Sequence, residues 1–125
     1  MTKKDAMRIR DYLEHILEAL KRIFDYVDDI GEVGFLTNSL IQDAVLRNLE
    51  IVGEASNKLV RYHDEFIKQY PDVPWEDMYW MRNRISHGYF SIDFEIIWKT
   101  IEQDLPIVNE QVQIIYEKIV AKSSL

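Results

Sequence analysis

The chain has 125 residues, a formal net charge of −7 at pH 7 and no cysteine. Disulfides and thiolate metal sites are therefore excluded, and the negative charge argues against a protein that coats nucleic acid through general attraction to phosphate. No apolar run approaches the roughly 18 residues of a membrane span, and the N-terminus lacks a signal-peptide core. We therefore expect a cytoplasmic protein without membrane contact, forming one globular domain over residues 1–125.

The charge is unevenly distributed along the chain. Residues 1–10 carry four basic side chains and one acidic side chain, whereas residues 11–54 carry three basic and ten acidic side chains. Residues 55–90 carry five of each. A polyanionic partner would therefore have to bind locally, near the start of the chain and near residues 82–87.

The first predicted element is a long amphipathic helix near the start of the chain. Apolar residues recur there in steps of four and three, which is the spacing of one helix face. Gly31 and Gly34 then predict a helix C-cap and a turn. The predicted apolar face consists of Ile9, Leu13, Ile16, Leu20, Ile23 and Val27.

A second helix is predicted to begin at Asn38 or Ser39, because Ser39 and Gln42 have the spacing of a capping box. Gly53 and Ala55 within it are small enough to let another helix approach closely. Its predicted inward face consists of Ile41, Val45, Leu49, Val52, Ala55 and Leu59.

The next segment predicts a break and a third helix. A short helical turn is expected over residues 64–69, before Pro71 and Pro74 interrupt the chain. Pro74 fits the first position of a helix that should end near Gly88.

A fourth helix is predicted to begin at a cap formed by Ser91 or Asp93. Pro106 should kink it by crowding the carbonyl group of Glu102. Four amphipathic helices with short connections predict an all-α, antiparallel up-and-down four-helix bundle, and leave room for a short fifth helix. The predicted apolar face of the fourth helix consists of Phe94, Ile97, Ile101, Leu105, Val108, Val112, Ile115 and Ile119.

The stretch RNRISHGYF at 82–90 carries the strongest candidate chemistry. Arginine presents a planar fork that suits phosphate oxygens, and histidine titrates near neutral pH. Arg82 and His87 therefore suit RNA cleavage that needs no metal, with the 2′-hydroxyl as the nucleophile, so that DNA should not react. We expect no cofactor.

Helical spacing places these residues on two stripes. Arg82, Ser86 and Tyr89 fall on one stripe, and Asn83 and His87 lie about 100–140° around the helix from Arg82. Within one chain the arginine and the histidine converge only if the helix end unwinds or a facing element closes the cleft. Without further information, an arginine and a histidine near a helix end more often serve capping and hydrogen bonding than catalysis.

The same residues resemble a known family. Arg82, His87 and Tyr89 fit the Arg-x4-His-x-Tyr motif of the HEPN superfamily, and MRNRISHGYF is similar to its HepT toxin branch in the HepT/MntA systems. RNLEIVGEASNKL at 47–59 is similar to the second helix of that family, and WKTIEQDLPIV at 98–108 to its last helix. The resemblance covers essentially the whole chain.

The resemblance implies a role for each matching residue. Arg82 and His87 correspond to the ribonuclease pair, and Asn83 to the polar residue that follows the arginine. Tyr89 corresponds to the tyrosine that a cognate minimal nucleotidyltransferase antitoxin modifies by AMPylation. The family resemblance further implies a homodimer in which two motifs form one cleft, with RNA as the substrate.

Several other residues allow two interpretations. Glu54 could orient Arg82 or face solvent, and the sequence does not decide between these roles. His63 is expected to be a solvated loop residue. Three aromatic residues could stack on bases, although their helical spacing favours packing: Trp75, Tyr79 and Trp80.

One set of charged residues on the first helix could be drawn as a metal site: Asp11, His15 and Glu18. A solvated charged face is favoured for them, and no metal site is predicted.

Two functions follow from these observations. The first is an RNA endonuclease acting as the toxin of a type II/VII-like toxin–antitoxin pair. The second is a catalytically silent subunit that docks a nucleotidyltransferase, in which Arg82 and His87 bind nucleotide phosphates or order the interface. Cleavage of RNA by the purified protein separates the two.

Overall fold

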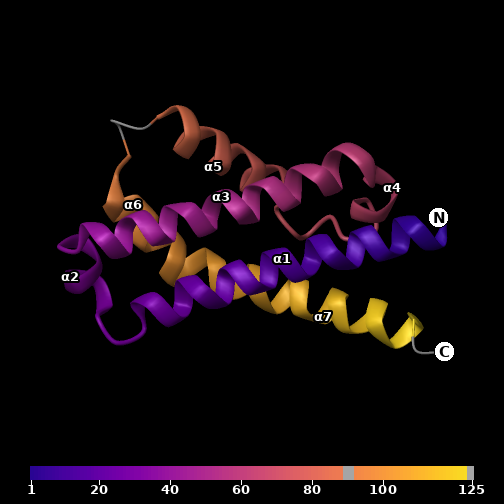
Figure 1. Ribbon diagram of the computed structural model, residues 1–125, viewed down its shortest axis with the longest axis horizontal. Helices are drawn as coiled ribbons and strands as arrows, with labels where there is room; N and C mark the ends of the chain where they lie inside the picture. Colours follow the sequence, from indigo (N-terminus) through magenta and orange to yellow (C-terminus); the bar gives the residue numbers. More distant parts are fainter. Residues whose placement is uncertain (89–91, 124–125) are drawn as a thin grey trace.

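The computed structural model describes residues 1–88 and 92–123, and the regular structure of this part is entirely helical. The predicted all-α class is therefore confirmed. The elements are α1 (Lys3–Val27), α2 (Gly31–Leu36), α3 (Ser39–Tyr62), α4 (Asp64–Ile67), α5 (Trp75–His87), α6 (Phe94–Lys99), the π-helix η1 (Thr100–Asp104) and α7 (Leu105–Ser123). Helix α3 packs against both α1 and α5, and α7 packs against α1 (Figure 1). No helix in the described residues is both long and apolar enough to cross a membrane.

The core forms where the apolar faces of α1, α3 and α7 meet. All six residues of the predicted α1 face are buried. The predicted face of α3 and the predicted face that spans α6, η1 and α7 are buried as well, except that Ile41, Phe94 and Ile119 are only partly buried. Periodic burial of apolar side chains is thus the main reason that these segments are helical.

The connection after α1 differs from the prediction. Asp28, not Gly31, occupies the C-cap of α1, and Gly31 supplies a turn with a φ of 62°. Gly34 lies inside the short helix α2, which the sequence did not predict. Phe35 of α2 is fully buried, with its ring centroid 5.7 Å from that of Trp98. Burial of this ring anchors α2 against α6.

Two of the predicted caps are also corrected. The side chain of Asn38 caps α3 by accepting a hydrogen bond from the backbone N–H of Ile41, so the Ser39–Gln42 capping box is wrong. Gln42 instead donates its amide to the carbonyl of Phe35. Pro74 occupies the N-cap of α5 rather than its first helical position.

The predicted cap of the fourth segment is confirmed in one of its two forms. Asp93 caps α6 by accepting hydrogen bonds from the backbone N–H groups of Glu95 and Ile96. The alternative cap, Ser91, lies outside the described residues.

The last predicted helix is divided by a π-turn. In η1 the backbone N–H of Leu105 donates to the carbonyl of Thr100, five residues earlier. Pro106 follows directly and has no N–H to donate, and in a regular α-helix its ring would crowd the carbonyl of Glu102. The structure thus has a π-turn where the sequence predicted a simple proline kink.

Small residues bring α5 close to α3. A β-carbon added to Gly53 would overlap the β-carbon of Arg82 and would lie 2.8 Å from the carbonyl oxygen of Met78. One turn along α3, the buried hydroxyl of Ser56 donates to the carbonyl of Trp75. The predicted close approach at Gly53 is therefore confirmed. It places the β-carbon of Arg82 directly against α3.

A polar contact joins α1 to α7. The hydroxyl of Tyr116 donates to Oε1 of Glu14 at 2.6 Å, and Nε of Arg10 donates to the same oxygen at 3.3 Å. The hydrogen bond from Tyr116 lowers the pKa of the Glu14 carboxyl, and the same bond raises the pKa of the Tyr116 hydroxyl. The contact is therefore a pH-dependent link between the two helices.

We expect Gly53→Ala to destabilise the protein. Replacing a helical glycine with alanine normally gains up to about 1 kcal/mol, but overpacking costs about 1–3 kcal/mol, and here the backbone of α5 leaves no space. Urea unfolding should show a lower midpoint than wild type. Asp43→Ala, at an exposed site of α3, serves as the control. A stabilised Gly53→Ala variant would contradict the close helix contact.

Tyr116→Phe should lower the free energy of unfolding by no more than about 1 kcal/mol, because both partners reach solvent. The folded pKa of Glu14 is lowered, so its contribution is complete above the ordinary glutamate pKa of about 4.3 and is lost as the pH falls further. The folded pKa of Tyr116 is raised, so its contribution is complete below about pH 10 and is lost above it. The difference in unfolding free energy between wild type and Tyr116→Phe, measured at several pH values, should be largest within this window. Tyr62→Phe, at an exposed tyrosine, should show no such pH-dependent difference from wild type.

Candidate active site

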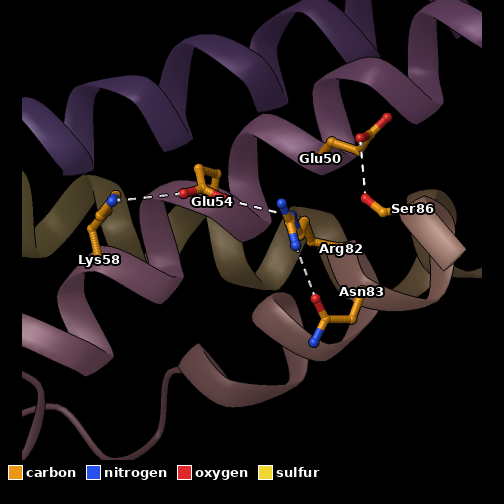
Figure 2. A network of polar contacts seen from close by, with 6 residues as sticks. All are labelled: Glu50, Glu54, Lys58, Arg82, Asn83 and Ser86. Carbon is orange, nitrogen blue, oxygen red and sulfur yellow. Dashed lines mark hydrogen bonds and ion pairs between the residues drawn. The ribbon is translucent and has the colours of Figure 1, made fainter.

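The centre of the candidate site is Arg82, which points from α5 across the surface of α3. Its Nε lies 3.4 Å from Oε2 of Glu54, and its Nη1 donates to Oδ1 of Asn83 at 3.0 Å (Figure 2). Glu54 also lies 3.9 Å from Nζ of Lys58. Glu54 therefore contacts Arg82, while its own side chain remains 46% exposed to solvent.

The guanidinium of Arg82 keeps donors for a ligand. An arginine side chain has five N–H groups; one on Nη1 donates a hydrogen bond to Asn83, and the one on Nε lies in the ion pair with Glu54. The other three have no hydrogen-bond partner among residues 1–88 and 92–123. Because the side chain of Arg82 is 34% exposed, these donors are accessible to phosphate oxygens.

His87 is exposed at the last position of α5. Among the described residues no hydrogen bond or ion pair joins it to Arg82. A separation of five helical residues places the two side chains about 140° apart around the helix, with Asn83 between them at about 100°. Helix α5 stays helical through His87, and its cap bond, from the backbone N–H of Gly88 to the carbonyl of Arg84, is 2.7 Å long. Unwinding therefore does not bring the pair together.

Ser86 continues the stripe of Arg82. Its hydroxyl donates to Oε2 of Glu50 at 3.3 Å, so this stripe of α5 faces α3 at two successive turns (Figure 2). Tyr89, predicted on the same stripe, lies outside the described residues, as does Phe90.

The structure gives different outcomes for the predictions about the tryptophans of α5 and about His63. Trp75 is buried, and its Nε1 donates to the carbonyl of Tyr70, which confirms the packing interpretation for this residue. Trp80 is 58% exposed and lines a cavity between α5 and α6, so the packing interpretation does not hold for it. His63 lies in the connection between α3 and α4, as expected, but it is only partly exposed, because its ring packs near Tyr12 with the two centroids 6.0 Å apart.

The charged residues of α1 do not form a metal site. Asp11, His15 and Glu18 are all exposed, which confirms the solvated charged face. The described residues contain no group of three or more histidine, aspartate or glutamate side chains that could hold a metal ion. The basic start of the chain lies at the opposite end of the long axis from the end of α5, so the two basic segments do not form one site (Figure 1).

A shallow cavity of about 260 Å³ lies beside Arg82, between α1, α3 and α5. Its lining includes Arg47 and Lys58, which the sequence did not indicate as site residues, and His15, which the sequence indicated only as part of a disfavoured metal site. The one available signal was the helical spacing of Arg47, Glu54 and Lys58 on one side of α3. That signal becomes useful only once α5 is known to lie beside them.

Comparison with known proteins identifies the family. The protein-family model described as Ribonuclease HepT-like matches residues 16–115, which include α3, α5 and the whole Arg82–His87 stretch. The chain belongs to this family. No solved structure is a significant match to it.

Relatives of this HepT-like chain come from archaea and bacteria. A protein from Methanocaldococcus jannaschii, named for an inferred RNase activity, is 36% identical over 115 residues, covering 92% of this chain and 100% of the relative. A protein from Thermococcus cleftensis, named as an inferred ribonuclease HepT, is 39% identical over 97 residues, covering 78% and 86%. A third, from Caldanaerobacter subterraneus subsp. tengcongensis and also named for an inferred RNase activity, is 36% identical over 109 residues, covering 87% and 95%.

Proposed function

We propose that this HepT-like protein is a metal-independent RNA endonuclease and the toxin of a toxin–antitoxin pair. The observation that carries the proposal is the state of Arg82: Glu54 and Asn83 hold its guanidinium in place, while three N–H donors stay available beside the end of α5 where His87 is exposed. Membership of the family and the names of its relatives support RNA as the substrate.

The proposed chemistry needs only the two side chains and the substrate. The imidazole of His87 takes the proton of a 2′-hydroxyl, and the freed oxygen attacks the adjacent phosphorus. The N–H groups of Arg82 stabilise the negative charge that accumulates on the phosphate oxygens. The bond to the 5′-oxygen breaks, that oxygen takes up the proton that His87 accepted, and the products carry a 2′,3′-cyclic phosphate and a 5′-hydroxyl. DNA has no 2′-hydroxyl and is not cut.

A second copy of the chain completes the proposed site. The proposal takes the long helices as one four-helix domain over residues 1–125 that forms a homodimer. Because α5 stays helical through His87, the histidine and Arg82 of one chain remain on different sides of the helix. A facing α5 from the second copy would supply an arginine or a histidine on the open side of the cleft.

The proposed control point is Tyr89, which a cognate minimal nucleotidyltransferase antitoxin would AMPylate. Tyr89 follows the end of α5 by two residues, a distance of at most about 7 Å along the chain. An AMP group there would bring a phosphate to the free donors of Arg82 and would repel the RNA backbone. Silencing would then require no change of fold.

One observation favours the second candidate, a catalytically silent subunit of a nucleotidyltransferase complex that binds nucleotide phosphates. Arg82 already has a carboxylate partner in Glu54, and the described residues show no contact between it and His87. The ribonuclease assay decides between the two candidates.

Purified protein should cleave single-stranded RNA in the presence of EDTA, and His87→Ala should lower the rate by on the order of 10²–10⁴-fold, because proton transfer then lacks its base. Arg82→Lys should also be strongly impaired, since an ammonium group cannot reproduce the planar fork. Gel analysis and mass spectrometry of the products should show 2′,3′-cyclic phosphate ends.

Three controls accompany this assay. His63→Ala removes a histidine that packs at the far end of α3 and should retain activity. Light scattering should report the mass of a dimer, and a purely monomeric protein would contradict the shared cleft. Activity that disappears with EDTA and returns with Mg²⁺, or equal activity of wild type and His87→Ala, would overturn the mechanism.

Co-expression with the cognate nucleotidyltransferase should raise the intact mass of the protein by one or more AMP units. Fragmentation should locate the addition on the peptide that contains Tyr89, and Tyr89→Phe should abolish it while leaving cleavage unrestrained. Tyr79→Phe, on the same helix as Arg82, is the matched control and should still be modified. Modified protein that cuts RNA at the wild-type rate would contradict this control.

A further inference from the structure

The cavity beside Arg82 is a shallow groove whose lining extends along α3 from Arg47 to Lys58. Glu50, Glu54 and Lys58 lie along one side of this helix, next to Arg82 of α5 (Figure 2). Ile51 and Ala55 also line the cavity from α3. Tyr12 and His15 of α1 line it opposite Arg82, so the groove has walls from α1 and α5.

The acidic side chains of the groove are already engaged. Glu54 contacts both Arg82 and Lys58, and Glu50 accepts a hydrogen bond from Ser86. Arg47 also lines the groove, is exposed, and has no ion-pair partner among the described residues. It is therefore available to an anionic ligand.

The local charge of the groove differs from that of the chain. Arg47, Lys58 and Arg82 contribute three positive charges, and Glu50 and Glu54 contribute two negative charges, which leaves +1. The whole chain carries −7. Without Arg47 the groove would have no net charge, so this residue sets its attraction for anions.

The spacing of the basic side chains suits an extended ligand. Arg47 and Lys58 are separated by eleven residues of α3, a rise of about 16 Å, and Arg82 contacts α3 between them at Glu54. A single small anion cannot contact both ends of such a groove, whereas a strand with a phosphate at every nucleotide can. Tyr12, which is partly buried, and His15, which is exposed, add two aromatic rings to the lining, with their centroids 6.5 Å apart.

We propose that this groove binds the RNA strand on its way to Arg82, and that Arg47 is a substrate-binding residue that contacts the RNA backbone one to two helical turns from the site of cleavage. The inference rests on the proposed ribonuclease function and adds to it the path of the substrate. RNA is favoured over an acidic protein partner because the groove leads directly to the free donors of Arg82.

The test measures binding without cleavage. Variants are made in the full-length His87→Ala protein, and fluorescence anisotropy follows a labelled single-stranded RNA over a series of salt concentrations. Loss of one phosphate contact should reduce the salt slope by about 0.7, which corresponds to on the order of fourfold weaker binding at 0.15 M salt. Arg47→Gln should show both changes, and Arg47→Lys should restore most of the affinity.

The control is Lys118→Gln, which removes the same charge from an exposed site on α7, outside the groove. This variant should bind RNA like the parent protein.

In the protein that retains His87, Arg47→Gln should raise KM and leave kcat unchanged, because it removes binding energy that is equal in the ground state and the transition state. The circular dichroism spectra and thermal unfolding curves of both variants should match those of wild type.

Each remaining outcome counts against the inference in a distinguishable way. If Arg47→Gln binds RNA like Lys118→Gln while Arg82→Gln binds weakly, the strand takes another path and the proposed function stands. If Arg47→Gln binds RNA normally but loses the nucleotidyltransferase, the groove is a protein-docking surface. If the parent protein binds no RNA and wild type cuts none, both the groove and the ribonuclease are wrong.

Discussion

The close contact between α3 and α5 is the constraint on which the candidate site depends. Gly53 has no side chain, and this absence lets the β-carbon of Arg82 lie directly against α3. The next residue, Glu54, contacts the other end of the same side chain. Two consecutive residues of α3 thus determine the positions of the β-carbon and of the guanidinium of Arg82. A larger residue at position 53 would move the arginine away from both its partner and the groove.

Much of the fold could be predicted from the sequence because its signals are local and repeated. The six apolar positions of α1 follow one helical face, and each added turn strengthens the same prediction. The caps are single-residue features, and there the prediction was displaced by one residue, as at Asn38 and Pro74. Helix α2 was missed because it is short and its buried residue, Phe35, packs against Phe94 and Trp98, which are far away in the sequence.

The candidate site was predictable to the extent that it lies on one helix. Arg82 and His87 were identified from their spacing and from the family motif, and their separation around α5 follows from helical geometry. The partner of Arg82 was left undecided because the pairing with Glu54 depends on the register of two helices. The groove with Arg47 could not be identified from the helical spacing on α3 alone, since its walls come from α1, α3 and α5.

The arrangement around Glu54 has a consequence for how Arg82 can move. This carboxylate lies between two cations, with Lys58 on one side and Arg82 on the other. When an anionic ligand draws the guanidinium away, Lys58 can approach Glu54 more closely, and the carboxylate keeps a counter-ion. With all three side chains partly exposed, water also fills the position that the arginine leaves. Arg82 is therefore held by an exchangeable partner, and its release leaves no uncompensated charge behind.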